Sequence, residues 1–534
     1  MIINPITGGG EWMVSKLPIG IQGFEKLRND NFLYIDKSEY IYNLVHNNVP
    51  YFLSRPRRFG KSLLLSTLRA YWEGKKELFD GLKITALEGN NAEAWKKYPV
   101  FYFDFNGENY NTSSIEEVLE QHLMGWEDIY GNKYQGESLG FRFEKLLEMA
   151  YKKTGLRCVV LVDEYDKPLL DVINDSIKEN HTKDVFKGFF SRLKKADEFV
   201  QFVFITGVSK FHKVSIFSDL NQLRDISLNK EYSGICGITD VELNFYFKDE
   251  IKRLSENQKM TVKECISVLK STYDGYCFHP SGVNVYNPYS ILNAFSDGEF
   301  GSYWFETGTP TFLIKKIRES SFDIRKFTNG TLYADESVLK DYTGDNPDPV
   351  PLLFQTGYLT IADYDKRLNR YTLRFPNDEV AYGFLKCLIP EYNPRATAGN
   401  GLDIFTIIGF VENANLEKIR DTLVALFAGI PYTKKQDPFE HDFQSVIYIL
   451  FTLMGQYVQC EIHTFNGRID CKVETPNYVY LFEFKRDQRE DETLKQIDSK
   501  DYALPFAADS RKLFKIGVSF DSSTRMLSGW KVAE

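Results

Sequence analysis

The stretch "SRPRRFGKSLLL" (54–65) holds a glycine, a lysine and a hydroxyl side chain in the order that a phosphate-binding loop uses. Backbone N–H groups at the start of the helix that follows would face an anion. We expect Lys61 to reach the terminal phosphates of a nucleotide and the Ser62 hydroxyl to bind Mg²⁺. The predicted nucleotide contacts in this loop are Arg58, Phe59, Gly60, Lys61, Ser62 and Leu63.

One position departs from the loop pattern. Arg55 stands where the first glycine is expected, and glycine there usually supplies an unusual backbone angle. The arginine leaves the shape of the loop open to question, although it does not affect the end that binds the anion.

Acidic residues follow a second apolar run, "CVVLVDEYDKPLLD" (158–171). A continuous apolar run predicts a strand buried on both faces, and ligands bind at the carboxyl ends of such strands. Asp163 would hold Mg²⁺ through water, and Glu164 would orient and activate the attacking water. The alternative is a helix cap after a core strand. On the next strand, Thr206 or Ser209 would sense the γ-phosphate, unless the hydroxyl only binds backbone.

A second group of residues near the C-terminus has the chemistry of a metal-dependent hydrolase. Glu483 and Lys485 share one face of an expected strand, and Asp470 lies on the neighbouring strand. Two converging carboxylates repel each other unless a divalent cation lies between them, and oxygen ligands suit Mg²⁺ or Mn²⁺. The lysine would orient water or stabilise a phosphate oxygen. The alternative is a salt bridge on an edge strand. Glu440 is either a further metal ligand or a helix cap.

These residues require particular elements to position them. The front third predicts a parallel sheet covered by helices, from strands at 49–54, 100–107, 158–163 and 202–210 and a helix at 61–72. The tail predicts a helix, three strands, a helix and a strand, at 437–455, 456–465, 468–475, 478–487, 489–503 and 512–520.

The middle of the chain is less informative. Two amphipathic helices with threonine caps would form a lid over the nucleotide, and 358–375 predicts a hairpin. Residues 330–351 are expected to be a connecting loop. Arg57, Arg58 and Arg224 are alternative arginine fingers.

Composition limits the class of protein. The 534 residues are too many for one hydrophobic core, and the formal net charge of −9 means that a nucleic acid would need a local basic groove. The seven cysteines form no close-spaced pairs, which predicts reduced thiols in the cytoplasm. We identify no secretion signal, and the longest apolar run is too short to span a bilayer.

The motifs together carry a resemblance. "RPRRFGKSLLLSTL", "VVLVDEYDKPLL", "YDGYCF" and "LFQTGYLTI" resemble the AAA-ATPase-like family, and "GRIDCKVETPNYVYLFEFK" resembles the PD-(D/E)XK nuclease superfamily. In the first family "RPRRFGKS" is the usual form of the loop. The resemblance implies an α/β multidomain fold: a P-loop parallel sheet with helices on both faces, a mostly helical middle and a restriction-endonuclease-like tail. The expected divisions are a tail at 1–15 and domains at 16–238, 239–430 and 431–534, with a helical lid and a winged-helix-like part in 239–430.

The predicted function is an ATP-binding protein and ATPase fused to a Mg²⁺- or Mn²⁺-dependent nuclease, with DNA favoured over RNA and no membrane partner. Cleavage would be gated by ATP, and the oligomeric state is left open. One alternative is a nucleotide-dependent switch or scaffold whose nuclease-like tail only binds nucleic acid or a partner. Another is a motor ATPase that the tail loads onto DNA.

Overall fold

The protein is described by a computed structural model. It describes residues 16–533 except 48, 132, 211–215, 221–222, 307–312, 315, 318–319, 321, 323, 328–331, 341, 343–347, 393–403, 429–457, 465–466, 522 and 525. The chain divides into two compact units. Unit 1 comprises Met1–Gly308 and Tyr333–Val380, and unit 2 comprises Thr309–Leu332 and Ala381–Glu534.

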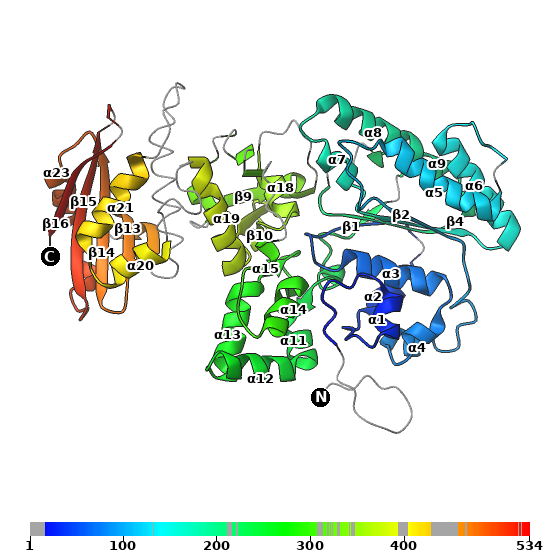
Figure 1. The fold of residues 1–534 in the computed structure, drawn as a ribbon, viewed down its shortest axis with the longest axis horizontal. Helices are drawn as coiled ribbons and strands as arrows, with labels where there is room; N and C mark the ends of the chain where they lie inside the picture. Colours follow the sequence, from blue (N-terminus) through cyan, green and yellow to red (C-terminus); the bar gives the residue numbers. More distant parts are fainter. Residues whose placement is uncertain are drawn as a thin grey trace. The chain divides into compact units, whose positions relative to one another are not determined.

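A parallel five-stranded sheet lies at the centre of unit 1, in the order β2-β3-β4-β1-β5 (Figure 1). Its inner strands are built from continuous apolar runs and are buried along most of their length, as expected for a sheet covered on both faces. The strands are β1 (Tyr51–Ser54), β2 (Val100–Asp104), β3 (Cys158–Asp163), β4 (Val200–Gly207) and β5 (Arg224–Asp225).

Helices cover both faces of this sheet (Figure 1). On one face lie α1 (Phe24–Asn29), α2 (Ser38–Val45), α3 (Lys61–Trp72) and α4 (Lys83–Glu88). On the other lie α5 (Ile115–Tyr130), α6 (Leu139–Thr154), α7 (Lys167–Asp171), α8 (Ser176–Phe190) and α9 (Arg192–Lys195). The three-layer arrangement confirms the predicted α/β sheet.

The middle of the chain is mostly helical, as predicted. Thr239 and Thr261 each cap a helix and form a capping box with a glutamate three residues later. The helices are α11 (Asp240–Tyr246), α12 (Lys248–Asn257), α13 (Val262–Tyr273), α14 (Pro288–Asp297), α15 (Tyr303–Glu306), α17 (Glu336–Lys340), α18 (Val350–Gln355) and α19 (Asp378–Tyr392). The chain passes from unit 1 to unit 2 within α19.

Two small sheets complete unit 1. One has the order β6-β8-β7, from β6 (Ile238–Thr239), β7 (Tyr276–Cys277) and β8 (Asn284–Tyr286). The other has the order β10-β11-β9, from β9 (Leu332–Asp335), β10 (Thr360–Asp365) and β11 (Arg370–Arg374). The hairpin expected at 358–375 is therefore confirmed. The connecting loop expected at 330–351 is wrong in part, because this segment forms β9 and α17, where buried Leu332, Ala334 and Leu339 pack into the core.

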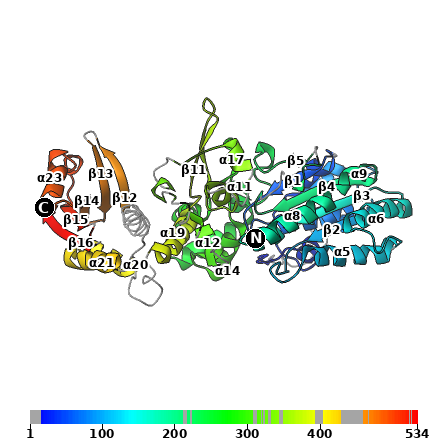
Figure 2. The same ribbon diagram turned by 90° about the horizontal axis from the view of Figure 1, so that it is seen from above.

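Unit 2 contains a five-stranded mixed sheet in the order β12-β13-β14-β15-β16. Helix α23 covers one face, and α20 and α21 lie on the other (Figure 2). The elements are α20 (Ile404–Glu412), α21 (Leu416–Ala428), β12 (Val458–Thr464), β13 (Gly467–Glu474), β14 (Tyr478–Arg486), α23 (Glu490–Ser499), β15 (Lys512–Asp521) and β16 (Met526–Ala533). The three strands, the helix after them and the last strand of the prediction are present, the first predicted helix at 437–455 falls outside the described residues, and β16 is an additional edge strand.

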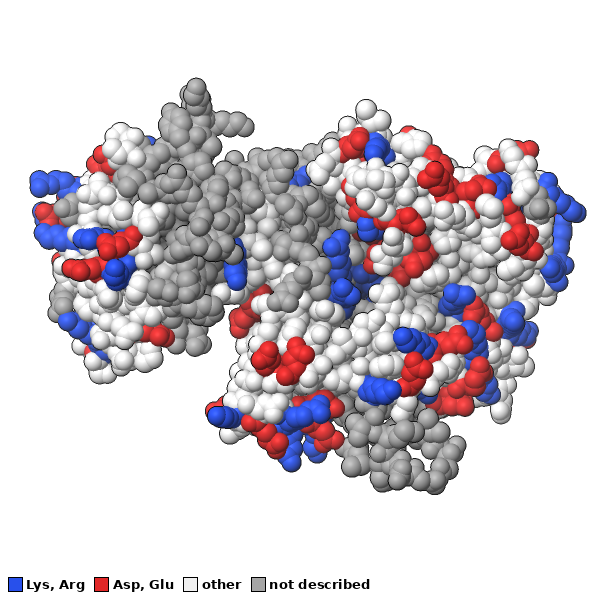
Figure 3. Space-filling model, in the orientation of Figure 1, with Lys and Arg blue, Asp and Glu red and all other residues white. Residues whose placement is uncertain are grey.

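Acidic and basic side chains are interspersed over much of the face shown in Figure 3. Within the described ranges, none of the helices has both the length and the apolar character needed to cross a membrane.

Candidate functional site

The loop between β1 and α3 takes its shape from two residues in the left-handed region. Gly60 has φ of 90° and caps α3, and Arg58 has φ of 69°. Arg55 is not among the residues with positive φ. The first position of this loop therefore does not need glycine, and the turn into the helix is made three to five residues later.

Arg55 has a structural role instead. Its side chain is 1 % exposed, and its guanidinium donates to the carbonyl oxygens of Ser54 (2.9 Å), Ser227 (2.8 Å) and Tyr232 (3.0 Å). It also lies 3.9 Å from the ring centroid of Phe278, and burial lowers its pKa to about 10. Arg55 thus ties the start of the loop to the segment after β5.

The loop and the end of β3 meet at Asp163. This carboxyl is 2 % exposed; its Oδ2 accepts from the Tyr102 hydroxyl at 3.3 Å, and its Oδ1 has no hydrogen-bond partner among the described residues. Burial raises the pKa of Asp163, while the Ser62 hydroxyl and the Lys61 ammonium oppose the rise. A buried carboxylate oxygen without a partner beside a hydroxyl fits a Mg²⁺ site. Lys61 itself is buried and donates to the Pro56 carbonyl at 3.2 Å.

Three further predicted site residues, at or just after the ends of β3 and β4, differ in whether their polar groups already have a hydrogen-bond partner. Glu164 has φ of 51°, and burial raises the pKa of its carboxyl. Ser209 donates to Asp166 Oδ2 at 2.7 Å, so its hydroxyl is already engaged in holding the loop after β4. Thr206 is fully buried on β4, and its Oγ1 has no partner among the described residues.

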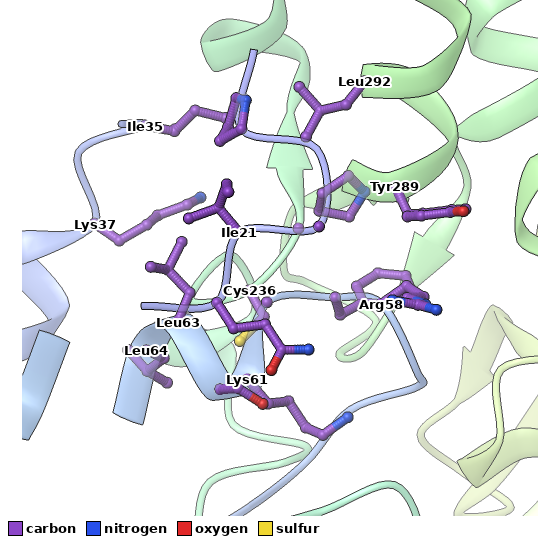
Figure 4. A pocket seen from close by; sticks show the side chains of 18 of the residues that line it. Ile21, Ile35, Lys37, Arg58, Lys61, Leu63, Leu64, Cys236, Tyr289 and Leu292 are labelled. Atoms are coloured by element: carbon purple, nitrogen blue, oxygen red, sulfur yellow. The ribbon is translucent and has the colours of Figure 1, made fainter. Parts of the chain in front are cut away.

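A cavity of about 550 Å³ opens onto this loop (Figure 4). It brings together Arg58, Phe59, Gly60, Lys61, Ser62, Leu63 and Glu164 of the predicted contacts. Asp163 and Thr206 are not part of its lining. Beyond the loop the wall becomes apolar, with Ile21, Ile35 and Leu292. One polar end and one apolar end suit a nucleotide, whose phosphates and base differ in the same way.

The middle region supplies part of this wall. Tyr289 and Leu292 on α14 line the cavity together with Phe247 before α12. The guanidinium of Arg58 lies 4.8 Å from the ring centroid of Tyr289. Of the two helical segments predicted to form the lid, 239–258 reaches the cavity through Phe247 alone, 261–276 does not line it, and α14 was not part of that prediction.

In unit 2, Asp470 lies where the pairing between β13 and β14 ends. The last backbone pair of this ladder is Cys471 with Phe482. Beyond that pair, β14 is contacted by the carboxylate of Asp470. Its Oδ2 accepts from the backbone N–H of Phe484 at 2.9 Å. The carboxylate is thereby fixed beside Glu483.

Glu483 is 1 % exposed and faces α23. Its Oε1 accepts from Lys485 Nζ at 2.9 Å and from the side-chain amide of Gln496, while its Oε2 has no partner among the described residues. Burial and then the charge of Asp470 raise the pKa of Glu483 to about 7. Two close carboxylates, one with an unpaired buried oxygen, fit the oxygen ligands of Mg²⁺ or Mn²⁺.

The structure does not describe every predicted metal ligand. Glu440 falls outside the described residues. Within the described parts of the chain no group of three or more His, Cys, Asp and Glu could hold a metal, so the pair Asp470 and Glu483 stands without a third protein carboxylate there. Phe482 and Phe484 stack with centroids 6.0 Å apart on the opposite face of the strand, because alternate residues of a strand point to opposite faces.

Comparison with known proteins finds a family for each of two parts of the chain. The family model described as "Predicted AAA-ATPase" matches residues 18–217, and that of the "PD-(D/E)XK nuclease superfamily" matches residues 438–530. A protein of Azotobacter chroococcum mcd 1, called "Uncharacterized protein in vnfD 5'region", is 34% identical over 535 residues, covering 97% of this chain and 98% of the relative. The chain belongs to the AAA-ATPase-like family.

Some residues of this AAA-ATPase-like protein were not predicted from its sequence. Gln496, which donates to Glu483, is a polar residue between the buried Leu494 and Ile497 of α23, and that inward position is the signal that could have found it. Tyr102 could have been found from its place two residues before the end of β2. The apolar cavity wall has no local signal, since its residues come from distant segments.

Proposed function

We propose that this AAA-ATPase-like protein is a cytoplasmic ATPase fused to a nuclease that cleaves DNA with Mg²⁺ or Mn²⁺, and that ATP controls the cleavage. The observation that carries the proposal is the same at both sites. A buried carboxylate oxygen, Asp163 Oδ1 in unit 1 and Glu483 Oε2 in unit 2, has no partner among the described residues. Burial of an unpaired carboxylate oxygen is energetically unfavourable unless a cation binds to it.

In unit 1 the N-terminus of α3 and Lys61 would hold the phosphates of ATP. Ser62 and Asp163 would hold Mg²⁺, and Glu164 would accept a proton from the attacking water. The apolar end of the cavity would take the base. Thr206 would contact the γ-phosphate side of the site from β4.

In unit 2, Asp470 and Glu483 would hold the divalent cation, with Glu440 as a further ligand. Lys485 would orient water or stabilise charge on the phosphate oxygen. A bound cation supplies charge stabilisation and a more acidic water. The hydrogen bond from the Gln496 side-chain amide would fix the orientation of the Glu483 carboxylate.

The test is cleavage of plasmid DNA with Mn²⁺, with and without ATP, by wild type, Asp470→Ala and Lys61→Ala. We expect wild type to cut, Asp470→Ala to be inactive, and Lys61→Ala to lose the response to ATP. Cleavage that survives in Asp470→Ala would place the activity elsewhere. Cleavage that is the same with and without ATP in wild type would contradict the control by ATP.

A further inference from the structure

Residues late in unit 1 contact the backbone of the phosphate-binding loop directly. The indole Nε1 of Trp304, 6 % exposed on α15, donates to the Arg57 carbonyl at 3.2 Å. Gly357 lies over Pro56, since a Cβ at Gly357 would be 2.6 Å from the Pro56 Cβ. Two consecutive loop residues are therefore held from outside the nucleotide-binding sheet.

The same region holds the loop after β4. Gln355, at the end of α18, accepts from the backbone N–H of Lys210 at 2.7 Å. The Lys210 ammonium lies 2.9 Å from Asp225 Oδ2. Asp166, three residues after Asp163, accepts from the Ser209 backbone N–H at 2.6 Å in this loop. Both loops that flank the candidate phosphate site thus contact residues 304–357.

One of these contacts, that of Trp304, leads on to Glu379, which is 3 % exposed in the first turn of α19. Its Oε1 accepts from the Trp304 backbone N–H at 2.8 Å, and its Oε2 accepts from the Ser290 hydroxyl at 2.8 Å. Ser290 follows Tyr289 on α14, where Tyr289 lines the cavity. One carboxylate is therefore linked to the phosphate loop through Trp304 and to the cavity wall through Ser290.

Nucleotide binding would disturb this arrangement at a defined point. Lys61 donates to the Pro56 carbonyl at 3.2 Å, and a bound phosphate would compete for the same ammonium. That carbonyl belongs to the residue that Gly357 covers and precedes the one that Trp304 holds. A ligand shifts an equilibrium only through contacts that differ between two states, and this hydrogen bond is the contact that a phosphate would weaken.

We infer that Trp304 and Glu379 are positioning residues that couple the state of the phosphate-binding loop to helix α19. The inference rests on the proposed function, because it assigns the control by ATP to named contacts. Helix α19 begins in unit 1 and its residues from Ala381 onward belong to unit 2. A change at Glu379 therefore acts on the helix through which the chain passes from the ATPase unit to the nuclease unit.

The test is hydrogen exchange of a peptide covering 378–388 in the full-length protein, with Mg²⁺ and a non-hydrolysable ATP analogue and without them. We expect its exchange in wild type to change about fivefold or more on binding. Trp304→Phe keeps an aromatic ring and removes the N–H donor, and Glu379→Gln keeps the shape and loses one acceptor. Both should bind the analogue and lose the change in exchange.

Trp72→Phe is the matched control, because the Trp72 Nε1 is buried without a hydrogen-bond partner among the described residues. It should keep the change in exchange. If wild type binds no ATP, the proposed function itself fails. If wild type binds the analogue and the 378–388 peptide exchanges at an unchanged rate, or if Trp304→Phe and Glu379→Gln both respond like wild type, the coupling is overturned and ATP binding stands.

Discussion

The carboxylate of Asp470 accepts a hydrogen bond of 2.9 Å from the backbone N–H of Phe484, the residue that separates Glu483 from Lys485. A side chain of β13 thus takes the place of a backbone acceptor of the same strand in the pairing with β14. This hydrogen bond fixes Asp470 close to Glu483, although their mutual repulsion favours separation. The pair is held in place by the sheet itself.

Asp470→Asn should separate the structural role of this residue from its charge. The amide oxygen can still accept from Phe484, so the melting temperature should change little. The loss of a charged ligand should lower Mn²⁺-dependent cleavage by about 100-fold or more. Cleavage rate and Mn²⁺ binding by calorimetry measure both effects.

Asp509→Asn is the matched control for that change. Asp509 is another carboxylate of unit 2, paired with Arg511 at 2.6 Å and distant in the sequence from the candidate ligands. Its variant should cut and bind Mn²⁺ like wild type. Equal loss of cleavage in both variants would mean that Asp470 acts through the fold alone.

Arg55→Gly should weaken the protein although it restores the glycine of the general loop pattern. Removal of the guanidinium leaves the buried carbonyls of Ser227 and Tyr232 without this donor, and each such group costs about 1–3 kcal/mol. We therefore expect a lower melting temperature and weaker ATP binding. Arg55→Lys, which keeps one donor group, should lose less. A variant Arg55→Gly that binds ATP as tightly as wild type would show that the arginine is dispensable.

The sequence predicted the elements that carry local signals. Helix α3 occupies 61–72 as expected, because Gly60 supplies the left-handed angle and the apolar run follows at once. The face of β14 that carries Glu483 and Lys485 followed from the two-residue repeat of a strand. Local pattern was sufficient in these cases.

Contacts between distant segments could not be predicted in this way. The replacement of glycine by Arg55 depends on carbonyl groups more than 170 residues away. The segment 330–351 has turn-forming residues that suggest a loop, but its β9 is stabilised by pairing with a strand that follows later in the chain. Such tertiary pairing overrides local composition.

Glu483 should make the stability of the metal-free protein depend on pH. Its pKa is about 7 in the folded state, above its ordinary value of 4.5, so the folded state binds more protons between these values. The free energy of unfolding should therefore fall as the pH rises through this range. The contribution is complete below about 4.5 and lost above about 7.

Melting of wild type and Glu483→Gln in EDTA at pH 5 and pH 8 measures this dependence. Glutamine cannot ionise, so the variant should gain stability relative to wild type at the higher pH. Added Mn²⁺ should then stabilise wild type at pH 8 and have little effect on the variant. A difference between the two proteins that is the same at both pH values would exclude the proton linkage.

Glu164→Gln should separate ATP binding from ATP hydrolysis. The amide keeps the size of the side chain that lines the cavity, so the dissociation constant for ATP should stay within about threefold of wild type. Glutamine cannot accept the proton of the attacking water, so turnover should fall by about 100-fold or more. Lys61→Ala should instead lose binding, because its ammonium is the group that would contact the phosphates. Binding of a fluorescent ATP analogue and phosphate release would be measured on the same preparations, and a Glu164→Gln protein that still hydrolyses ATP at the wild-type rate would remove Glu164 from the reaction.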